Sequence, residues 1–129
     1  MMWVDLVTLL AVIQFFCFAF FVGKARVKYG IRAPAVSGSI EFERYFRVQQ
    51  NTLETLIMFL PSLWIAAHYW STSSMALIGA VYLVGRVLYF FSYVRDPTRR
   101  TLGYALSIGP VGVLVVMGLL GVAMAVIKA

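Results

Sequence analysis

Four long apolar segments constrain the fold of this chain more than any other feature of its sequence. They cover residues 3–23, 48–70, 75–94 and 102–127 of the 129 residues, and about 20 mostly apolar residues are enough for one helix to cross a bilayer. Only 12% of the residues are charged, against about 25% in a typical soluble domain. The sequence therefore predicts an all-α membrane protein, a bundle of four transmembrane helices in one domain over residues 1–129.

Basic residues gather in two of the three predicted connections, residues 24–47 and 94–100, whereas the STSS connection at 71–74 has none. These basic residues are Lys24, Arg26, Lys28, Arg32, Arg44, Arg47, Arg95, Arg99 and Arg100. Loops rich in lysine and arginine remain in the cytoplasm, so we expect the first and third loops of this multi-pass protein to face it. The same charge attracts anionic membrane lipids. We expect no binding to nucleic acid, because a chain this apolar has no soluble basic module.

A polar stripe begins at the cytoplasmic mouth of the second segment. Arg47, Asn51 and Glu54 follow the spacing i, i+4, i+7, which places them on one face of a helix. Charges at membrane depth are costly and usually face a protein interior or a watery cavity. Two interpretations of this helix stay open: a structural Arg47–Glu54 ion pair, or one wall of a binding pocket.

A second polar stripe follows the third segment, where Tyr82, Arg86, Tyr89 and Tyr93 again share a helix face. Tyrosines near a membrane interface are often anchors, but an arginine within the stripe favours a binding site. Because a four-residue turn joins the two segments, we predict that the stripes face each other in an antiparallel hairpin. They would enclose a polar pocket that opens to the cytoplasm.

The fourth helix is predicted to begin near residue 97, because Asp96 and Pro97 suit the cap and first position of a helix. Arg99 and Arg100 then fall in its first turns and point about 100° apart. An arginine gains nothing from the dipole at a helix N-terminus. This position indicates that Arg100 serves a ligand or a lipid phosphate.

The side chains of these stripes suit a small zwitterion with extra carboxylates, such as a peptide. Arginines bind carboxylates in a bidentate manner, Glu54 suits an amine, and Asn51 and the tyrosines supply neutral hydrogen bonds. The single cysteine, Cys17, excludes a cysteine-based metal cluster, and we expect no metal cofactor.

Two segments resemble the MAPEG family, the membrane-associated proteins in eicosanoid and glutathione metabolism. They are EFERYFRVQQNTLETL at 41–56 and VYLVGRVLYFFSY at 81–93. The family signature E-R-x-x-R-x-x-x-N-x-x-E is matched here by Glu43, Arg44, Arg47, Asn51 and Glu54. The resemblance extends over nearly the whole chain, including the four-helix layout and the loop lengths.

The resemblance implies a homotrimer that binds glutathione, its co-substrate, between neighbouring subunits and conjugates it to a hydrophobic electrophile or lipid from the bilayer. Glutathione peroxidase activity on lipid hydroperoxides is a second activity that it implies. Arg100 matches the arginine that holds the glutathione sulfur as a thiolate. The other matching positions are Arg47, Asn51, Glu54, Tyr89 and Tyr93 within one subunit, and Arg26 and Gln49 from the adjacent subunit.

The sequence departs from the family pattern at two positions. Val27 replaces a second basic residue found in leukotriene-forming members, which argues against leukotriene synthesis. Thr55 replaces an aromatic residue that commonly follows the glutamate, which weakens one expected glutathione contact. The chain ends at Ala129, just past the fourth segment, and this compactness suits a bacterial inner-membrane protein with a detoxifying role; a eukaryotic member would reside in the endoplasmic reticulum.

A non-catalytic lipid-binding accessory protein, a type that the family also contains, is the alternative function. That type is expected to lack the full set of glutathione residues. The presence here of Arg47, Asn51, Glu54 and Arg100 favours the enzyme. Glutathione binding by the detergent-purified protein distinguishes the two.

Overall fold

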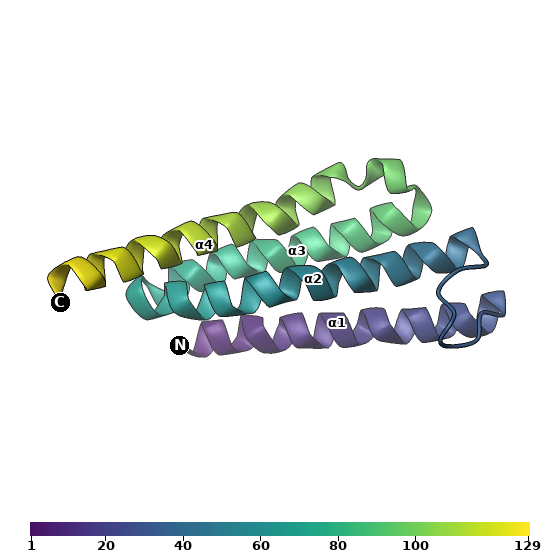
Figure 1. The fold of residues 1–129 in the computed structure, drawn as a ribbon, viewed down its shortest axis with the longest axis horizontal. Helices are drawn as coiled ribbons and strands as arrows, with labels where there is room; N and C mark the ends of the chain where they lie inside the picture. Colours follow the sequence, from purple (N-terminus) through teal and green to yellow (C-terminus); the bar gives the residue numbers. More distant parts are fainter.

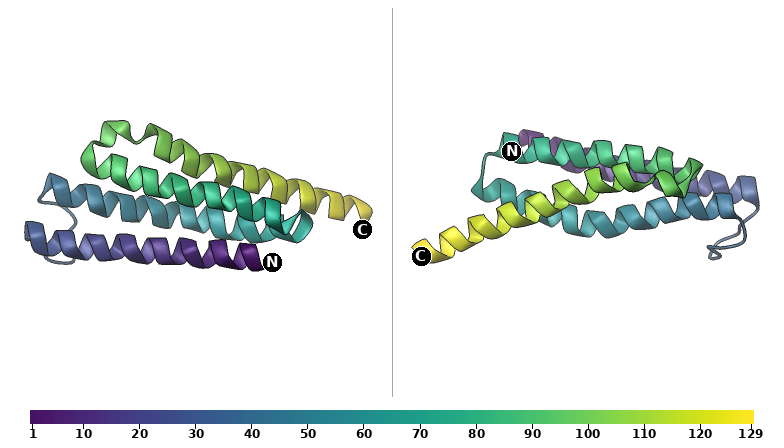
Figure 2. Two further views of the ribbon diagram at one scale, coloured as in Figure 1. Left: turned by 180° about the vertical axis from the view of Figure 1, so that it is seen from behind. Right: turned by 90° about the horizontal axis from the view of Figure 1, so that it is seen from above.

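The computed structural model describes residues 1–129 and consists of four long helices in an elongated antiparallel bundle (Figure 1). They are α1 (Met2–Tyr29), α2 (Ile40–Tyr69), α3 (Thr72–Arg95) and α4 (Thr101–Lys128), and one 3₁₀ turn, η1 (Pro97–Arg99), precedes α4. The predicted all-α, four-helix architecture is confirmed. The α1–α2 and α3–α4 connections lie together at one end of the bundle, called the loop end below, and the α2–α3 turn lies at the other (Figures 1 and 2).

Three helices, α1, α3 and α4, are long and apolar enough to cross a membrane. The chain is therefore a multi-pass integral membrane protein. Helix α2 is not among the three, since its first half carries Gln49, Asn51 and Glu54. A membrane span over residues 48–70 stays a prediction, which is supported by the position of α2 alongside the other helices of the bundle (Figure 1).

The first connection is shorter than the predicted loop of residues 24–47. Helix α1 continues to Tyr29 and ends at Gly30, whose left-handed φ of 71° suits a residue without a Cβ. Helix α2 begins after Ser39, whose hydroxyl oxygen accepts a hydrogen bond from the backbone N–H of Phe42. The polar residues on both sides of the loop thus extend the helices beyond their apolar parts, because lysine, arginine and glutamate are themselves good helix formers.

Helix α4 begins at Thr101, which corrects the predicted start near residue 97. Asp96 is indeed a cap, but of the turn η1. Its Oδ1 accepts hydrogen bonds from the hydroxyl (2.8 Å) and the backbone N–H (3.1 Å) of Thr98, and these bonds hold the pKa of Asp96 below its usual value. Arg100 follows the turn as the N-cap residue of α4. The helical angle of 100° between Arg99 and Arg100 therefore does not apply.

The apolar core fills the half of the bundle away from the loop end. Val4, Phe59, Leu63 and Leu114 have no exposed surface there, and the ring of Phe59 stacks on Tyr82 with centroids 3.9 Å apart. Beyond Tyr82, towards the loop end, the interior becomes polar. Two smaller apolar clusters, around Phe18 and around Phe42, remain at the loop end beside α1. The fold therefore buries its hydrogen-bonding side chains in one region, between α2, α3 and α4.

Two glycines bring α3 and α4 together in this polar half. A Cβ on Gly85 would lie 2.5 Å from the backbone carbonyl of Leu106, and a Cβ on Gly103 would lie 2.6 Å from the Cα of Tyr89. Small residues at such points allow two helix backbones to approach closely. The close approach holds the polar face of α3 against α4.

Candidate functional site

Arg86 lies at the centre of a buried polar cluster between α2, α3 and α4. It has no exposed surface. Its Nε donates to Ser107 Oγ at 2.8 Å, and its Nη1 donates to Asn51 Oδ1 at 2.8 Å and to Thr52 Oγ1 at 3.2 Å. The guanidinium also lies over the ring of Tyr89, 4.4 Å from its centroid, within the range of a cation–π contact. The predicted meeting of the two polar stripes is thus confirmed for Asn51 and Arg86, whereas Arg47 and Glu54 form no hydrogen bond to the α3 stripe.

Arg86 fixes the orientation of the Asn51 amide. A guanidinium can only donate hydrogen bonds, so the Asn51 atom that faces it must be the oxygen. The two Nδ2 hydrogens of Asn51 then point to its other side, where they are available to an acceptor. Asn51 keeps 9% of its surface exposed, so its amide is held rigidly at the edge of the buried cluster.

Arg47 and Glu54 form an ion pair on the outer side of the same stripe. Arg47 Nη1 lies 3.8 Å from Glu54 Oε1, and the two side chains are 54% and 58% exposed. An ion pair this exposed contributes about 0–1 kcal/mol to folding. A ligand that carries both charges can therefore replace the pair at small energetic cost.

A groove opens at the loop end between the start of α2 and the end of α3. Its volume is about 410 Å³, within the usual range for small-molecule sites. Tyr93 in its wall stacks on Tyr89 with ring centroids 5.4 Å apart, which connects the groove to the buried cluster. Arg44 fastens the two helices, since its Nη1 donates to the carbonyl of Arg95 at 3.1 Å. The groove is lined by Val36, Ile40, Glu43, Arg44, Phe46, Arg47, Tyr93 and Pro97.

Of the predicted site residues, only Arg47 and Tyr93 line this groove. Asn51, Glu54 and Tyr89 lie deeper along the same two helices, and the other three lie elsewhere at the loop end or on α2. Arg100 is exposed at the loop end, and its Nη1 donates to the carbonyl of Pro97 at 3.0 Å. Arg26 fastens the first loop, since its Nη1 donates to the carbonyl of Ala35 at 2.7 Å. Gln49 is half-buried on α2. That Arg26 and Gln49 act in the same site as Arg100 stays a prediction.

Comparison with known proteins identifies the family. The sequence profile of the MAPEG family matches residues 4–120. The chain belongs to the MAPEG family. It is 44% identical over 117 residues to microsomal glutathione S-transferase 2 from Homo sapiens, covering 91% of this chain and 80% of that protein. It is 43% identical over 122 residues to an uncharacterised protein from Synechocystis sp., covering 95% and 89% of the two chains.

A third MAPEG relative is leukotriene C4 synthase from Rattus norvegicus. It is 37% identical to this chain over 115 residues, covering 89% of this chain and 77% of that protein. The resemblance inferred from the two motifs is thus confirmed at the level of the family.

Thr55, the departure from the MAPEG pattern, has a structural partner. Its side chain is buried, and its Oγ1 donates to the backbone carbonyl of Thr52 at 3.1 Å. Because this bond uses the only hydroxyl hydrogen of Thr55, the hydroxyl of Tyr82 must be the donor in the 2.8 Å bond between the two side chains. Thr55 therefore links α2 to α3 and does not face the groove.

The sequence did not indicate that Arg86 takes Ser107 and Thr52 as partners. A usable signal existed, because a buried arginine must find acceptors, and Glu54 of α2 pairs with Arg47 instead. Ser107 and Thr52 are small hydroxyl residues, and each also donates to the carbonyl four residues earlier. Ser107 and Thr52 could be identified as its partners only if the rotation of α2 and α4 about their own axes were known, and the sequence does not give that rotation.

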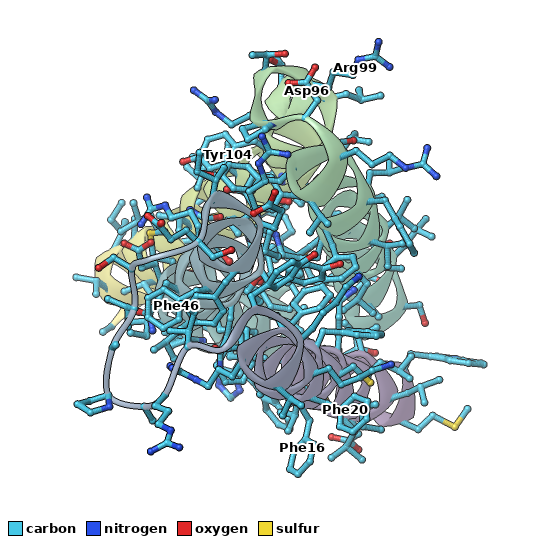
Figure 3. All side chains as sticks on the ribbon, turned by 90° about the vertical axis from the view of Figure 1, so that its right-hand side faces the viewer. Phe16, Phe20, Phe46, Asp96, Arg99 and Tyr104 are labelled. Atoms are coloured by element: carbon cyan, nitrogen blue, oxygen red, sulfur yellow. The ribbon has the colours of Figure 1, made fainter.

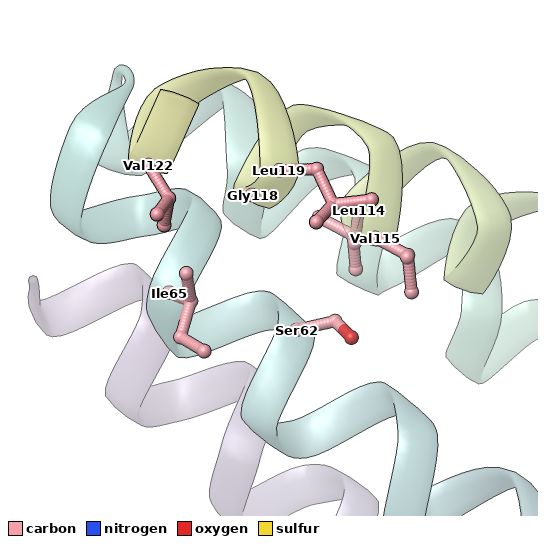
Figure 4. Close-up of a pocket in the computed structure, with 7 residues that line it drawn as sticks. All are labelled: Ser62, Ile65, Leu114, Val115, Gly118, Leu119 and Val122. Carbon is pink, nitrogen blue, oxygen red and sulfur yellow. The ribbon is translucent and has the colours of Figure 1, made fainter. Parts of the chain in front are cut away.

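An apolar cavity of about 200 Å³ lies between α2 and α4 in the other half of the bundle (Figure 4). On α4 its lining begins at Leu114, which is fourteen residues beyond Arg100. At 1.5 Å of rise per residue the two are about 20 Å apart along the helix. An apolar molecule in this cavity would not reach a reacting group held at Arg100.

Proposed function

We propose that this MAPEG protein is a membrane-bound glutathione transferase, which conjugates the thiolate of glutathione to hydrophobic electrophiles. The observation that carries the proposal is the Asn51 amide, fixed by the buried Arg86 beside the exposed Arg47–Glu54 pair. Glutathione has two carboxylates and an ammonium group. Arg47 suits a carboxylate, Glu54 suits the ammonium, and the Asn51 Nδ2 suits a carbonyl or carboxylate oxygen.

Arg100 is the residue that we assign to the sulfur. A free thiol has a pKa near 8.5 and is mostly protonated at neutral pH, and a nearby guanidinium favours its charged form. The Arg100 side chain is exposed and bonds only to the carbonyl of Pro97, so it can turn towards a ligand. The thiol releases its proton to water at the exposed loop end. The sulfur electron pair then forms the bond to carbon, and the leaving group departs with the bonding pair of the electrophile.

The active form in this proposal is a homotrimer in which Arg26 and Gln49 reach the glutathione of the adjacent subunit. The basic loop end faces the cytoplasm, and the electrophile arrives from the bilayer between subunits. Cross-linking of the detergent-solubilised protein should give trimers, and a monomer that still binds glutathione would contradict the shared site.

Comparison of Arg100→Ala with Arg99→Ala tests the enzymatic assignment. Arg99 is its matched neighbour, exposed and paired with Asp96 at 3.8 Å. Arg100→Ala should raise the pKa of bound glutathione, measured as thiolate absorbance against pH, and should slow conjugation of a model aryl halide. Arg99→Ala should change neither. Absence of glutathione binding by the parent protein would instead support a lipid-binding accessory role.

A further inference from the structure

Two lysines near the end of α1 have no acidic partner. Lys24 and Lys28 are exposed and lie one helical turn apart, and both ion pairs of the chain are formed by other residues. Like charges at i and i+4 destabilise a helix by a few tenths of a kcal/mol. An anion bound between the two ammonium groups would remove this repulsion.

These lysines border a cavity of about 260 Å³ between α1 and α2. Aromatic rings form much of the rest of its wall, and the ring of Tyr45 packs edge-on against Phe90, 5.9 Å between centroids. No acidic side chain lines it. The cavity therefore combines two cations and two phenol hydroxyls with an apolar wall. Its lining residues are Phe21, Lys24, Ala25, Lys28, Tyr29 and Tyr45.

An apolar surface continues from the lysines along α1 towards the middle of the bundle. Phe16 and Phe20 are 76% and 62% exposed, and both point outward from α1 (Figure 3). With Lys24 and Lys28 they repeat every four residues, so each side chain lies one turn from the next and the row winds around the helix by about 40° per step. The Lys24 ammonium lies 5.9 Å from the centroid of the Phe20 ring. The phenylalanines lie deeper in the membrane and the lysines lie at the end of the helix. This order matches a phospholipid, whose acyl chains lie deeper than its phosphate.

We propose that this cavity binds the headgroup of an anionic phospholipid from the leaflet at the loop end. Lys24 and Lys28 hold the phosphate, the hydroxyls of Tyr29 and Tyr45 donate to its oxygens, and the acyl chain lies along Phe20 and further into the bilayer. Basic pockets between membrane helices on the cytoplasmic side are typical sites for such lipids. A net negative headgroup is preferred, because the cavity has no carboxylate to hold a choline group.

This lipid site is separate from the residues proposed for glutathione. Arg26, the one such residue on α1, is two positions from each lysine and so projects about 160° away from them around the helix. Its guanidinium is turned to the loop, where it donates to Ala35 and lies over the ring of Phe42. Substitutions in the lipid site should therefore leave glutathione binding unchanged, and substitutions in the glutathione site should leave lipid binding unchanged.

The test is native mass spectrometry of the full-length protein in detergent, titrated with phosphatidylglycerol or with phosphatidylcholine of the same acyl chains. The parent protein should bind phosphatidylglycerol more tightly. The double variant Lys24→Gln/Lys28→Gln should weaken phosphatidylglycerol about 30-fold, about 2 kcal/mol, since each basic residue near an anionic lipid surface contributes about 1 kcal/mol. Phosphatidylcholine binding should change by less than about threefold.

The matched control is Arg95→Gln/Arg99→Gln, which removes two exposed charges from the same end but not from the cavity. It should leave phosphatidylglycerol binding within about threefold, and an equal loss in both double variants would overturn the proposal in favour of general surface charge. Phe20→Ala should weaken the lipid but not change any binding of glycerol 3-phosphate. Displacement of the lipid by millimolar glycerol 3-phosphate would assign the site to a soluble phosphate and overturn the lipid assignment.

Discussion

Replacement of either partner of the Arg47–Glu54 pair separates a structural role of these residues from a ligand-binding role. An ion pair with a 3.8 Å separation and side chains more than half exposed contributes about 0–1 kcal/mol to folding. A charged hydrogen bond to glutathione contributes about 1.5–3 kcal/mol, which corresponds to about 13- to 160-fold in the dissociation constant. Arg47→Ala and Glu54→Ala should therefore weaken glutathione binding by at least about tenfold with little loss of stability.

Both quantities can be measured on one detergent-solubilised sample, glutathione binding by titration calorimetry and stability by unfolding followed with circular dichroism. Arg99→Ala is the matched control, because it breaks the other exposed ion pair of the chain, Arg99–Asp96, which has the same 3.8 Å separation. The control should lose equally little stability and keep its glutathione affinity within about twofold.

The opposite pattern would refute this reasoning. If Arg47→Ala and Glu54→Ala each lost more than about 2 kcal/mol of stability while glutathione affinity stayed unchanged, the pair would be a structural lock between helices or subunits. Loss of affinity in only one of the two variants would show that only that residue contacts the ligand.

Three further predictions concern the buried cluster, the helix packing and the orientation. Arg86→Met should raise the dissociation constant of glutathione by up to about 160-fold in calorimetry, because Asn51 loses the charged hydrogen bond that orients its amide, worth about 1.5–3 kcal/mol. Gly103→Leu should lower the unfolding temperature in detergent, because the new Cβ would collide with the backbone of α3 at Tyr89. Gly112→Leu is its control and should not lower it, because a Cβ there has no neighbouring atom within 4 Å. A cysteine at Ser73, placed in a chain without the native thiol, should react with an impermeant reagent only from the non-cytoplasmic side; labelling from the cytoplasm would reverse the orientation.

The helices of the fold were predictable because they depend on local composition. Apolar segments long enough to cross a bilayer give the number of helices, and short connections force neighbours to run antiparallel. The ends of the helices were less predictable. Residues 24–29 and 40–47 carry many charges, but a solvated helix end and a loop have similar composition. Only the glycine at position 30 marked the true end of α1. Asp96 gave a correct cap signal, yet a cap does not distinguish an α-helix from a 3₁₀ turn.

The candidate site was partly predictable for the same reason. Helical spacing places Tyr82, Arg86 and Tyr89 on one face from the sequence alone, and the structure buries all three. Spacing does not fix how far each helix is rotated towards its neighbours. The contact of Arg86 with Asn51 depends on that rotation, which the close approach of Gly85 to the backbone of α4 helps to set. The sequence could therefore predict that the two polar stripes face each other, but not which residue of one contacts which residue of the other.

The absence of a carboxylate beside Arg86 bears on what the site can bind. Its three hydrogen-bond acceptors are neutral, and an arginine stays protonated in proteins, so its positive charge is not cancelled within the cluster. Arg47 and Glu54 largely cancel each other, whereas Arg44 at the groove and Arg100 at the loop end have no acidic partner within 4.0 Å. Uncompensated positive charge beside low-dielectric walls raises the local concentration of anions. The carboxylate of Glu43 also lines the groove, but Arg44, Arg86 and Arg100 together outnumber it. The site as a whole therefore favours a ligand with net negative charge, such as the proposed glutathione, over a neutral or cationic peptide of the same size.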